Sequence, residues 1–431
     1  MMTTTFPKYE SYKDSGVEWL GEIPSHWNIK KLKFCCKSNV RVLPENAPPD
    51  LQIQYVDIGS VSQGKIERVE YHAFKDAPSR ARRLAQRGDT IISTVRTYLK
   101  AISYIEEEYE DCIFSTGFAV LNPSNFFDSK FFSYLLQSEI FIDEVVRYSK
   151  GVSFPAITSL ELGNLPVSIP NIEEQKRIVD FLDRTTADID RAIAQKQRLI
   201  ELLKEQKAIV INQAVTKGLN PNAPMRDSGV QWLGEIPEHW EVWRSKRLFN
   251  QRKEFAQSDD IQLSATQAYG VIPQEEYEDR IGRKVTKIFQ HLEKRRHVEV
   301  GDFVISMRSF QGGLERAWAN GCIRSSYVVL KPSAQVDIDF FSYVFKSSVY
   351  ISALQTTANF IRDGQDLNFD NFCAVDLALL PIEEQRAIAQ SLNVAVADNA
   401  KIAEQAQKEI DLLREFRQIV IANAVTGKIK V

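Results

Sequence analysis

Tyr12–Trp27 reads YKDSGVEWLGEIPSHW, and Met225–Trp240, which starts 213 positions later, reads MRDSGVQWLGEIPEHW. A second pair of similar stretches follows, because Ile172–Arg177 reads IEEQKR and Ile382–Arg386 reads IEEQR. One unit of about 210 residues is therefore used twice in tandem, and a repeat of this kind decides the architecture. Two similar modules in one chain indicate a task that is done twice, such as reading the two halves of one target.

Composition agrees with a soluble protein of more than one domain. The chain has 431 residues, of which 44% are hydrophobic and 26% charged, and a chain of this length exceeds a single hydrophobic core. No apolar run approaches the roughly 18–20 residues that span a bilayer, and the N-terminal stretch MMTTTFPKYE lacks the apolar core of a signal peptide. The five cysteines form no CxxC pair, which favours a reducing, cytoplasmic environment. Cys112 and Cys322 occupy equivalent repeat positions and are expected to be small core residues.

Each half is predicted to combine a mixed domain with a long helix, which makes the fold class α+β. Short β-type runs alternate with Gly, Pro, Asn and Asp, and one aromatic-rich helix is expected per half, near Lys130–Tyr148 and Asp339–Leu354. The long helices, near Ile172–Val215 and Ile382–Val425, each follow a proline and open with two glutamates. The predicted domains are a first mixed domain (1–170), a helix (171–216), a linker (217–224), a second mixed domain (225–380), and a second helix with its tail (381–431). The expected strands include Gln54–Ile58, Thr90–Val95, Ile113–Leu121 and Tyr327–Leu330.

Both long helices carry a heptad pattern, in which selected positions recur in alternating steps of four and three. This spacing is typical of a coiled-coil seam. The alternative is that each helix packs separately on its own domain. The seam positions are Ile178, Leu182, Thr185, Ile189, Ala192, Lys196, Leu199, Leu203, Gln206 and Val210 in the first helix, and Ile388, Leu392, Ala395, Asn399, Ile402, Ala406, Glu409, Leu413, Phe416 and Val420 in the second.

The polar seam residues predict an antiparallel pair in one register. If the numbers of paired residues sum to 605, Lys196 meets Glu409 and Gln206 meets Asn399, while the apolar positions meet apolar or small ones. A slip by one heptad would place Lys196 against an apolar side chain, and an unpaired buried charge is costly. The four polar residues are therefore expected to act as register markers.

The repeated motifs resemble a known family. WLGEIPSHW and WLGEIPEHW are similar to the opening of the specificity subunit of Type I restriction-modification systems, and LGNLPVSIPNIEEQKRIVDFLD and LALLPIEEQRAIAQSLN are similar to the start of its conserved helices. The resemblance covers essentially the whole chain, and both motifs occur twice in the right order. The second copy lacks the PVSIP-type extension before IEEQ, which shortens the offset from 213 to 210.

The resemblance implies a non-enzymatic, DNA-binding subunit. Each mixed domain would be a target-recognition domain that reads one half of a bipartite, asymmetric site in double-stranded DNA. The paired helices would set the half-site spacing, as dimer geometry does elsewhere, and would dock two modification (methyltransferase) subunits. Restriction subunits would join this complex. S-adenosylmethionine, ATP and magnesium are expected on the partner subunits, and no catalytic or metal site and no membrane is expected for this chain.

The charge balance restricts where DNA could bind. The net charge is −3, and 19 Lys and Arg face 21 Asp and Glu in each of the ranges 1–170 and 225–380, so a DNA face must be a local patch. Two clusters of basic residues precede Gly88-Asp89 and Gly301-Asp302. Arg82 and Arg83 in the first are equivalent to Arg295 and Arg296 in the second. Contacts shared by both halves are expected to reach phosphate, which carries no sequence information. The alternative is a solvated charged loop.

Base-reading residues should instead differ between the halves. After Gly-Asp the first half has STVRTYLKAIS (Ser93–Ser103) and the second SMRSFQGGLER (Ser306–Arg316). Arginine can contact guanine in a bidentate manner, and the neighbouring side chains suit groove contacts. A second candidate region is the loop Tyr148–Phe154 with its counterpart Asn359–Asn368. The candidates are Arg96, Tyr98, Lys100, Lys150 and Ser153 in the first half and Arg308, Phe310, Gln311, Arg362, Gln365 and Asn368 in the second.

A second class of function stays open from the residues alone. A coiled-coil scaffold with two protein-binding heads would show the same repeat and the same helices. An autonomous methyltransferase is disfavoured, because the Asn/Asp-Pro-Pro-Tyr/Phe motif is absent from the sequence. Sequence-dependent DNA binding separates the specificity subunit from the scaffold. The charged residues at Glu173–Gln175 and Glu383–Gln385 are further candidates for partner docking.

Overall fold

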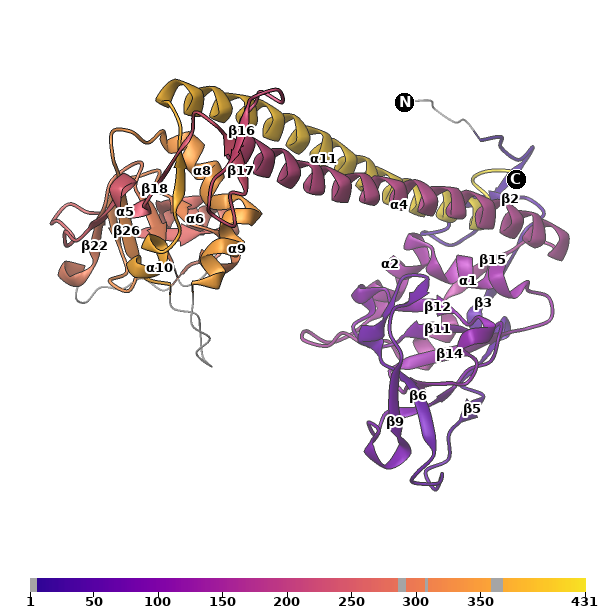
Figure 1. Ribbon diagram of the computed structural model, residues 1–431. Helices are drawn as coiled ribbons and strands as arrows, with labels where there is room; N and C mark the ends of the chain where they lie inside the picture. The colour runs from indigo at the N-terminus through magenta and orange to yellow at the C-terminus, as the bar shows by residue number, and fades with distance from the viewer. Residues whose placement is uncertain (1–5, 286–291, 307–308, 358–366) are drawn as a thin grey trace. The chain divides into compact units, whose positions relative to one another are not determined.

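The computed structural model describes residues 6–285, 292–306, 309–357 and 367–431, and the chain divides into two compact units (Figure 1). Unit 1 comprises Met1–Lys196 and Lys408–Val431, and unit 2 comprises Gln197–Gln407. Each unit therefore holds one mixed domain together with a part of both long helices. The fold combines helices and strands in both units, which confirms the predicted α+β class.

Unit 1 is built around two sheets. One is antiparallel with the strand order β12-β11-β14-β4, and the other has the order β5-β10-β13-β6-β9, in which β13 and β6 run parallel. The predicted run Ile113–Leu121 is two strands, because the chain turns at Thr116 and Gly117. The strands of the two sheets are β4 (Cys36–Ser38), β5 (Arg41–Val42), β6 (Gln52–Val56), β9 (Glu70–Ala73), β10 (Ala81–Leu84), β11 (Thr90–Ser93), β12 (Ile102–Tyr104), β13 (Cys112–Ser115) and β14 (Phe118–Pro123); the short pairs are β1 (Tyr12–Asp14) with β2 (Glu22–Pro24), β3 (Asn28–Lys31) with β15 (Pro166–Ile169), and β7 (Val61–Ser62) with β8 (Lys65–Ile66).

Unit 2 repeats the antiparallel sheet of unit 1 as β19-β26-β23-β24. Cys322 on β25 is 2% exposed and Cys112 on β13 is 0% exposed, which confirms both as core residues. The strands of unit 2 are β16 (Met225–Asp227), β17 (Glu235–Pro237), β18 (Glu241–Trp243), β19 (Phe249–Arg252), β20 (Leu263–Thr266), β21 (Gly270–Pro273), β22 (Arg296–Val298), β23 (Phe303–Ile305), β24 (Glu315–Arg316), β25 (Gly321–Ile323), β26 (Val328–Pro332) and β27 (Leu377–Leu379).

Where the sequence predicts one aromatic-rich helix per half, the structure has two. In unit 1, α1 (Ser129–Gln137) and α2 (Glu139–Tyr148) are separated by Ser138, and in unit 2, α8 (Ile338–Lys346) and α9 (Ser348–Thr356) are separated by Ser347. Each serine hydroxyl donates a 2.7 Å hydrogen bond to the carbonyl oxygen three residues earlier. Such bonds compete with the helical pattern, so the prediction of a single helix was wrong. The shorter helices are α3 (Ser159–Asn164), α5 (Ser245–Leu248), α6 (Gln274–Ile281), α7 (Ser309–Gly312) and α10 (Phe369–Cys373), and the 3-10 turns used below are η1 (Leu32–Phe34) and η4 (Thr97–Leu99).

The long helices extend over α4 (Ile172–Lys217) and α11 (Ile382–Val425), within two residues of the predicted ends. In unit 1, Ile178 and Leu182 of α4 share one core cluster with Val420 and Ile421 of α11. In unit 2, Ile211 and Val215 of α4 share a cluster with Ile388 and Leu392 of α11. The alternative in which each helix packs only on its own domain is therefore not what the structure has, because the two helices contact each other within each unit.

The predicted register places Lys196 opposite Glu409, and in unit 1 the Lys196 Nζ atom lies 2.5 Å from Glu409 Oε2. Both side chains remain 38% exposed, so the penalty for a slip is smaller than for fully buried charges. Gln206 is exposed and Asn399 half-buried, and within the described part of the chain no hydrogen bond joins them. The register therefore has one polar marker that makes contact rather than two.

Reversing one charge of this pair should have a small, measurable effect. Replacing Lys196 by Glu places two carboxylates together, and replacing Glu409 by Lys in the same chain restores an opposite-charge pair. Because the pair is partly solvated, we expect a coupling energy of about 0.2–1 kcal/mol from a double-mutant cycle of urea unfolding. A coupling energy of zero would contradict this register contact.

The two repeated sequence motifs contact each other in both units. Trp27 and Trp240 are fully buried. The preceding histidines are held by the second glutamate of the IEEQ motif, with 2.9 Å between His26 Nε2 and Glu174 Oε2 and 2.8 Å between His239 Nε2 and Glu384 Oε2. The motifs recur together because they form one structural contact.

The glutamine of each IEEQ motif fastens the long helix to the recognition domain. Gln175 is fully buried; its Oε1 accepts from the backbone N–H of Asp128 at 2.7 Å, and its Nε2 donates to the carbonyl oxygens of Phe126 and Pro170, each at 3.0 Å. Gln385 makes the same three bonds in unit 2, at 2.8–2.9 Å. Asp128 caps α1, so the clamp positions the first helix of the domain. Within the two stretches predicted to dock partners, Gln175 and Gln385 are buried, so only exposed charges such as Glu173 and Glu383 could take part.

The segment after each long helix returns to the buried tryptophan of a repeated motif. Gly218 follows α4 with a φ of +72° and lies against Trp240, and Gly427 follows α11 with a φ of +73° and lies against Pro24 and Trp27. In unit 1 the Nζ of Lys428 also donates to the carbonyl oxygens of Leu20 and Glu22. Residues 426–431 therefore complete unit 1 in the way that the segment after α4 completes unit 2.

None of the helices in the described ranges is both long and apolar enough to cross a membrane. In the same ranges, no group of three or more His, Cys, Asp or Glu side chains is arranged to hold a metal ion.

Candidate nucleic-acid interface

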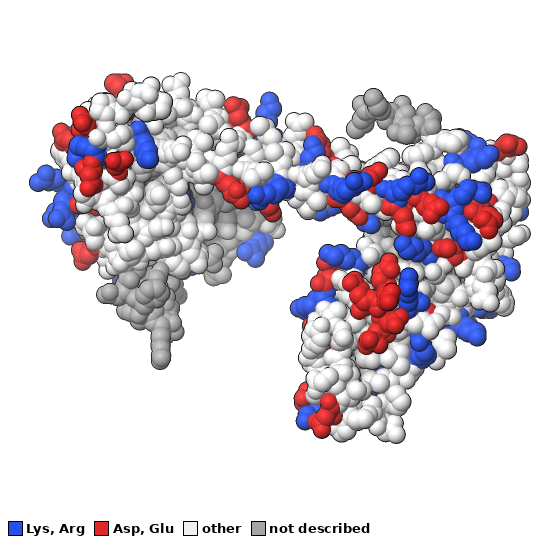
Figure 2. Space-filling model, turned by 45° about the vertical axis from the view of Figure 1, so that its right-hand side comes forward, with Lys and Arg blue, Asp and Glu red and all other residues white. Residues whose placement is uncertain are grey.

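The charge distribution gives no broad basic face on the side drawn in Figure 2, where blue and red side chains are interspersed. This agrees with the net charge of −3. A DNA-binding surface must therefore be built locally, from side chains that the fold brings together.

In unit 1 the two predicted reading loops come together, although they are about 50 positions apart in the sequence. The backbone N–H of Arg96 donates to the carbonyl oxygen of Pro155 at 2.7 Å, and the hydroxyls of Thr97 and Ser149 lie 2.7 Å apart. The Arg96 guanidinium lies 4.6 Å from the ring centroid of Phe154. One surface is thus formed by the loop after β11 and the loop after α2.

The second loop forms a narrow finger, Lys150–Ala156, which projects from unit 1 (Figure 1). Lys150 and Ala156 close its base through two backbone hydrogen bonds of 2.8 and 2.9 Å. At its tip Val152 is fully exposed, Ser153 is exposed and Phe154 is 58% exposed. Tyr98 is 50% exposed beside Arg96 on the first loop. A cation, aromatic rings and a hydroxyl therefore face solvent on one surface, a combination suited to base edges.

Two of the lysines that were predicted to contact DNA form ion pairs with glutamates. Lys100 Nζ lies 2.5 Å from Glu139 Oε2, and Lys150 Nζ lies 2.6 Å from Glu161 Oε1. The hydrogen bond from Lys150, together with bonds from Thr158, lowers the pKa of Glu161 to about 2. These ion pairs hold η4 against α2 and the finger against α3, so the structure gives both lysines a positioning role that the sequence did not predict.

The arginines that are equivalent across the repeat are engaged inside their own units. Arg83 lies in strand β10, and burial lowers the pKa of its guanidinium. Arg82 donates to the carbonyl oxygen of Ala81 and lies over the ring of Phe74. Arg295 is 8% exposed and donates to Gln262 Oε1 at 2.8 Å, while Arg296 in β22 donates to the carbonyl oxygen of Lys253. The alternative of a solvated loop does not describe these residues, because Arg82, Arg83 and Arg296 lie on strands and Arg295 is buried. Arg82, Arg83 and Arg296 are half-buried, and their contact with phosphate stays a prediction.

The reading loops of unit 2 are only partly within the described residues. Arg308, Arg362 and Gln365 lie outside them. Phe310 is half-buried and packs against the core of unit 2, whereas Gln311 on α7 is exposed. Asn368 is the N-cap of α10, with its Oδ1 accepting from the backbone N–H groups of Asp370 and Asn371. Its side-chain oxygen is therefore used within the fold.

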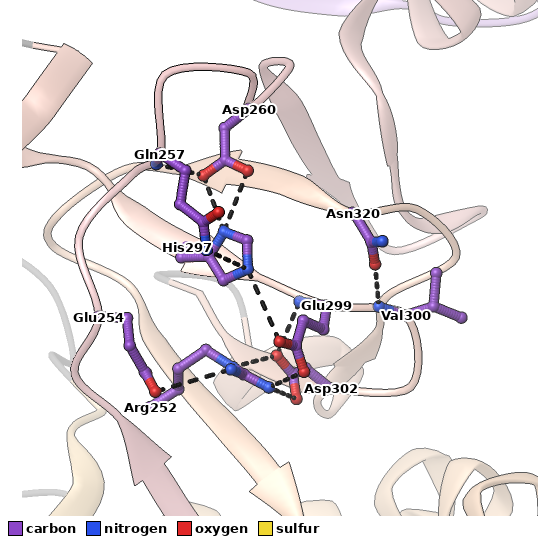
Figure 3. A network of polar contacts seen from close by, with 9 residues as sticks. All are labelled: Arg252, Glu254, Gln257, Asp260, His297, Glu299, Val300, Asp302 and Asn320. Atoms are coloured by element: carbon purple, nitrogen blue, oxygen red, sulfur yellow. Dashed lines mark hydrogen bonds and ion pairs between the residues drawn. The ribbon is translucent and has the colours of Figure 1, made fainter.

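A buried ionic network in unit 2 was not predicted from the sequence (Figure 3). The Arg252 side chain, 3% exposed, places Nε 2.7 Å from Asp302 Oδ2 and Nη2 2.5 Å from Glu299 Oε2. Burial raises the pKa of Asp302, and the hydrogen bond from Arg252 lowers that of Glu299. His297 Nδ1 lies 2.8 Å from Asp260 Oδ2 beside this network. The network fixes the turn that starts β23.

The repeated Gly-Asp is part of this turn in both units. Gly88 and Gly301 adopt φ angles of +91° and +90°. Asp89 and Asp302 each accept a 2.9 Å hydrogen bond from the backbone N–H three residues earlier. Both units contain the Gly-Asp pair because it forms the turn before β11 in unit 1 and before β23 in unit 2. The predicted reading loop begins at the end of each of these strands.

Comparison with known proteins agrees with this arrangement. Residues 24–202 match the family described as Type I restriction modification DNA specificity domain. A Methanocaldococcus jannaschii protein assigned as the MjaX specificity subunit of a type I restriction enzyme is 24% identical over 99% of this chain and 98% of its own length.

Two solved structures are similar in fold. One, from work on complex assembly and conformational transition of the type I R-M system, has a TM-score of 0.71 at 20% identity and covers 94% of this chain and 99% of that one. The HsdS subunit from Thermoanaerobacter tengcongensis has a TM-score of 0.54 at 20% identity and covers 94% and 98%. Taken with the duplicated motifs and the two long helices, these matches lead to one conclusion: residues 24–202 match the Type I restriction modification DNA specificity domain, and the chain over almost its whole length is similar to a type I specificity subunit.

Proposed function

We propose that this chain is the DNA-reading subunit of a Type I restriction-modification complex and that each recognition domain reads one half of a bipartite, asymmetric site. The observation that carries this proposal is the surface of unit 1, where Arg96 and the finger Lys150–Ala156 meet on a scaffold that unit 2 repeats. The scaffold is shared, whereas the sequences of the predicted reading loops differ between the units. Different readers on one chain predict a non-palindromic target.

The chemistry is assigned to partner subunits. The chain is a non-catalytic specificity subunit, so we propose that two modification subunits carry S-adenosylmethionine and methylate adenine, and that restriction subunits cleave DNA with ATP and magnesium. A cytoplasmic location is proposed with them, where double-stranded DNA is accessible. The alternative, a scaffold with two protein-binding heads, is not supported by the comparisons.

The paired helices offer a surface for these partners. A pair of helices buries only one side of each, and apolar side chains remain exposed along both. A contiguous apolar patch of this kind is typical of a protein-binding site, so we propose that these residues contribute to docking. The exposed residues are Leu199, Leu202, Ile209, Val394 and Ile402 in unit 2 and Leu412, Phe416 and Ile419 in unit 1.

The proposal is tested by producing this chain with its modification subunit in a host without DNA methylation and sequencing the genome for modified adenines. A split motif with an undefined spacer is expected, and it would reveal both half-sites. A stable complex that modifies no defined motif would contradict the proposed function and favour the scaffold.

Replacing Arg96 by Ala is expected to weaken binding to the target by about 1–3 kcal/mol, because the guanidinium can no longer pair with a base edge. Specificity should relax in one half-site only, since unit 2 is unchanged. Fluorescence anisotropy with duplexes altered in either half-site measures both effects. Arg87→Ala is the matched control, because Arg87 is exposed in the same unit and paired with Glu107. Equal losses on random DNA would contradict base reading.

A further inference from the structure

A short basic segment follows the repeated Trp-Leu-Gly-Glu-Ile-Pro motif in both units. In unit 1 it contains Lys30, Lys31 and Lys33, all exposed. In unit 2 it contains Arg244, Lys246 and Arg247, also exposed. Lys31 is equivalent to Arg244 and Lys33 to Lys246, both 213 positions apart. The positive charge is therefore a shared property of the two units.

Most of these cations are free of acidic partners. Among the described residues, no carboxylate forms an ion pair with Lys30, Lys31 or Lys33, nor with Lys246 or Arg247 in unit 2; Arg244 Nε lies 3.7 Å from Asp376 Oδ1. In contrast, Lys100 and Lys150 on the reading loops are both neutralised. Unpaired cations are the groups that can exchange small counterions for a polyanion.

Aromatic rings accompany the segment in each unit. Lys30 Nζ lies 4.6 Å from the ring centroid of Phe126, Lys33 Nζ lies 5.3 Å from that of Phe34, and the guanidinium of Arg247 lies 5.7 Å from that of Trp243. Phe34 is 64% exposed. Rings beneath the cations orient them without neutralising their charge.

A single short helix connects each basic segment to a reading loop. In unit 1 the finger is followed by α3, which carries Glu161, the partner of Lys150, and Gly163, which lies against Lys33. In unit 2 the helix α10 follows the counterpart segment and packs against α5, which contains Lys246 and Arg247. In unit 1 Lys33 therefore lies beside the helix that follows the finger, and in unit 2 Lys246 and Arg247 lie on a helix that packs against α10.

We infer that these two basic segments bind DNA phosphates next to each half-site and hold the reading loops in register on the duplex. The inference rests on the proposed function and extends it, because it assigns phosphate contacts to a segment that is exposed in both units, whereas Arg295 is buried. Since both units share the segment, the contacts carry no sequence information.

The test is the salt dependence of DNA binding by the full chain with its modification subunit. The variant Lys31→Gln/Lys33→Gln removes two cations from unit 1. Anisotropy titrations over a range of salt concentrations, on the target duplex and on a scrambled duplex, give the slope of log Kobs against log[salt]. Two lost phosphate contacts should reduce its magnitude by about 1.8, at about 0.9 for each. The loss should be the same on both duplexes.

Lys65→Gln/Lys75→Gln is the matched control. It changes the net charge of unit 1 equally but removes lysines already paired with Glu67 and Asp50, so the slope should stay close to that of the unaltered complex. Lys246→Gln/Arg247→Gln should reproduce the effect from unit 2.

An unchanged slope in both segment variants would overturn the inference, and if association with the modification subunit were lost at the same time, the segments would instead be a protein-docking surface. These outcomes differ from failure of the proposed function, which would appear as no preference of the unaltered complex for any sequence.

Discussion

Replacing Gln175 by Ala is expected to lower the free energy of unfolding of unit 1 by about 3–5 kcal/mol, because the change removes three hydrogen bonds and leaves a cavity at a fully buried site. The N–H of Asp128 and the carbonyl oxygens of Phe126 and Pro170 would lose their partner, and each would stay away from water. Urea unfolding followed by circular dichroism measures the loss.

The repeat supplies an internal comparison for this prediction. Gln385→Ala should have an effect of similar size, but in unit 2. Hydrogen exchange separates the two, since protection should fall in α1 for the first variant and in α8 for the second. Glu173→Ala is the control, because its side chain lies on the same helical turn and is 73% exposed; a change within about 0.5 kcal/mol is expected. A loss as large as that of Gln175→Ala would argue against the clamp.

Replacing Gly427 by Ala is expected to destabilise unit 1 by about 2–5 kcal/mol. The φ of +73° disfavours any residue with a Cβ, at about 1–2 kcal/mol, and the added methyl would overlap Pro24 and approach Trp27, at about 1–3 kcal/mol. The midpoint of thermal unfolding of unit 1 reports the sum.

Gly16→Ala separates the two contributions to the Gly427 effect. Gly16 lies in the same unit with a φ of +68°, and no atom lies within 4 Å of where its Cβ would be. It should therefore show the backbone cost without the clash. If both variants lose the same stability, the close approach of Gly427 to the motif tryptophan has no energetic role.

Sequence periodicity predicted the elements whose pattern is long or repeated. The ends of α4 and α11 follow from a proline, two glutamates and a glycine, and the contact between Lys196 and Glu409 follows from matching polar seam positions. The meeting of Arg96 with Phe154 was not predicted, although both loops were candidates, because it depends on how η4 and α2 pack in three dimensions.

Individual side chains were harder to place than elements, for reasons that lie outside local sequence. Arg295 looked like a solvated cation, yet it is buried, and its Nη1 donates to Gln262, 33 positions away. Lys100 is neutralised by Glu139 on another element. A cluster of charged residues in the sequence indicates the sign of a surface, but it does not show whether a residue distant in the sequence neutralises that charge. The absence of an acidic partner for Lys31 and Lys33, among the described residues, therefore became visible only in the structure.

The division of the chain between the units also bears on biosynthesis. Domains generally fold in the order in which they leave the ribosome, and unit 2 is one continuous stretch, Gln197–Gln407. The synthesis of unit 1 begins first, but unit 1 also includes Lys408–Val431. This stretch contains Gly427, which lies against Trp27. During translation the first domain therefore cannot complete its hydrophobic core until the second domain has been synthesised. Nascent chains that stall before residue 408 would expose that core to chaperones and proteases.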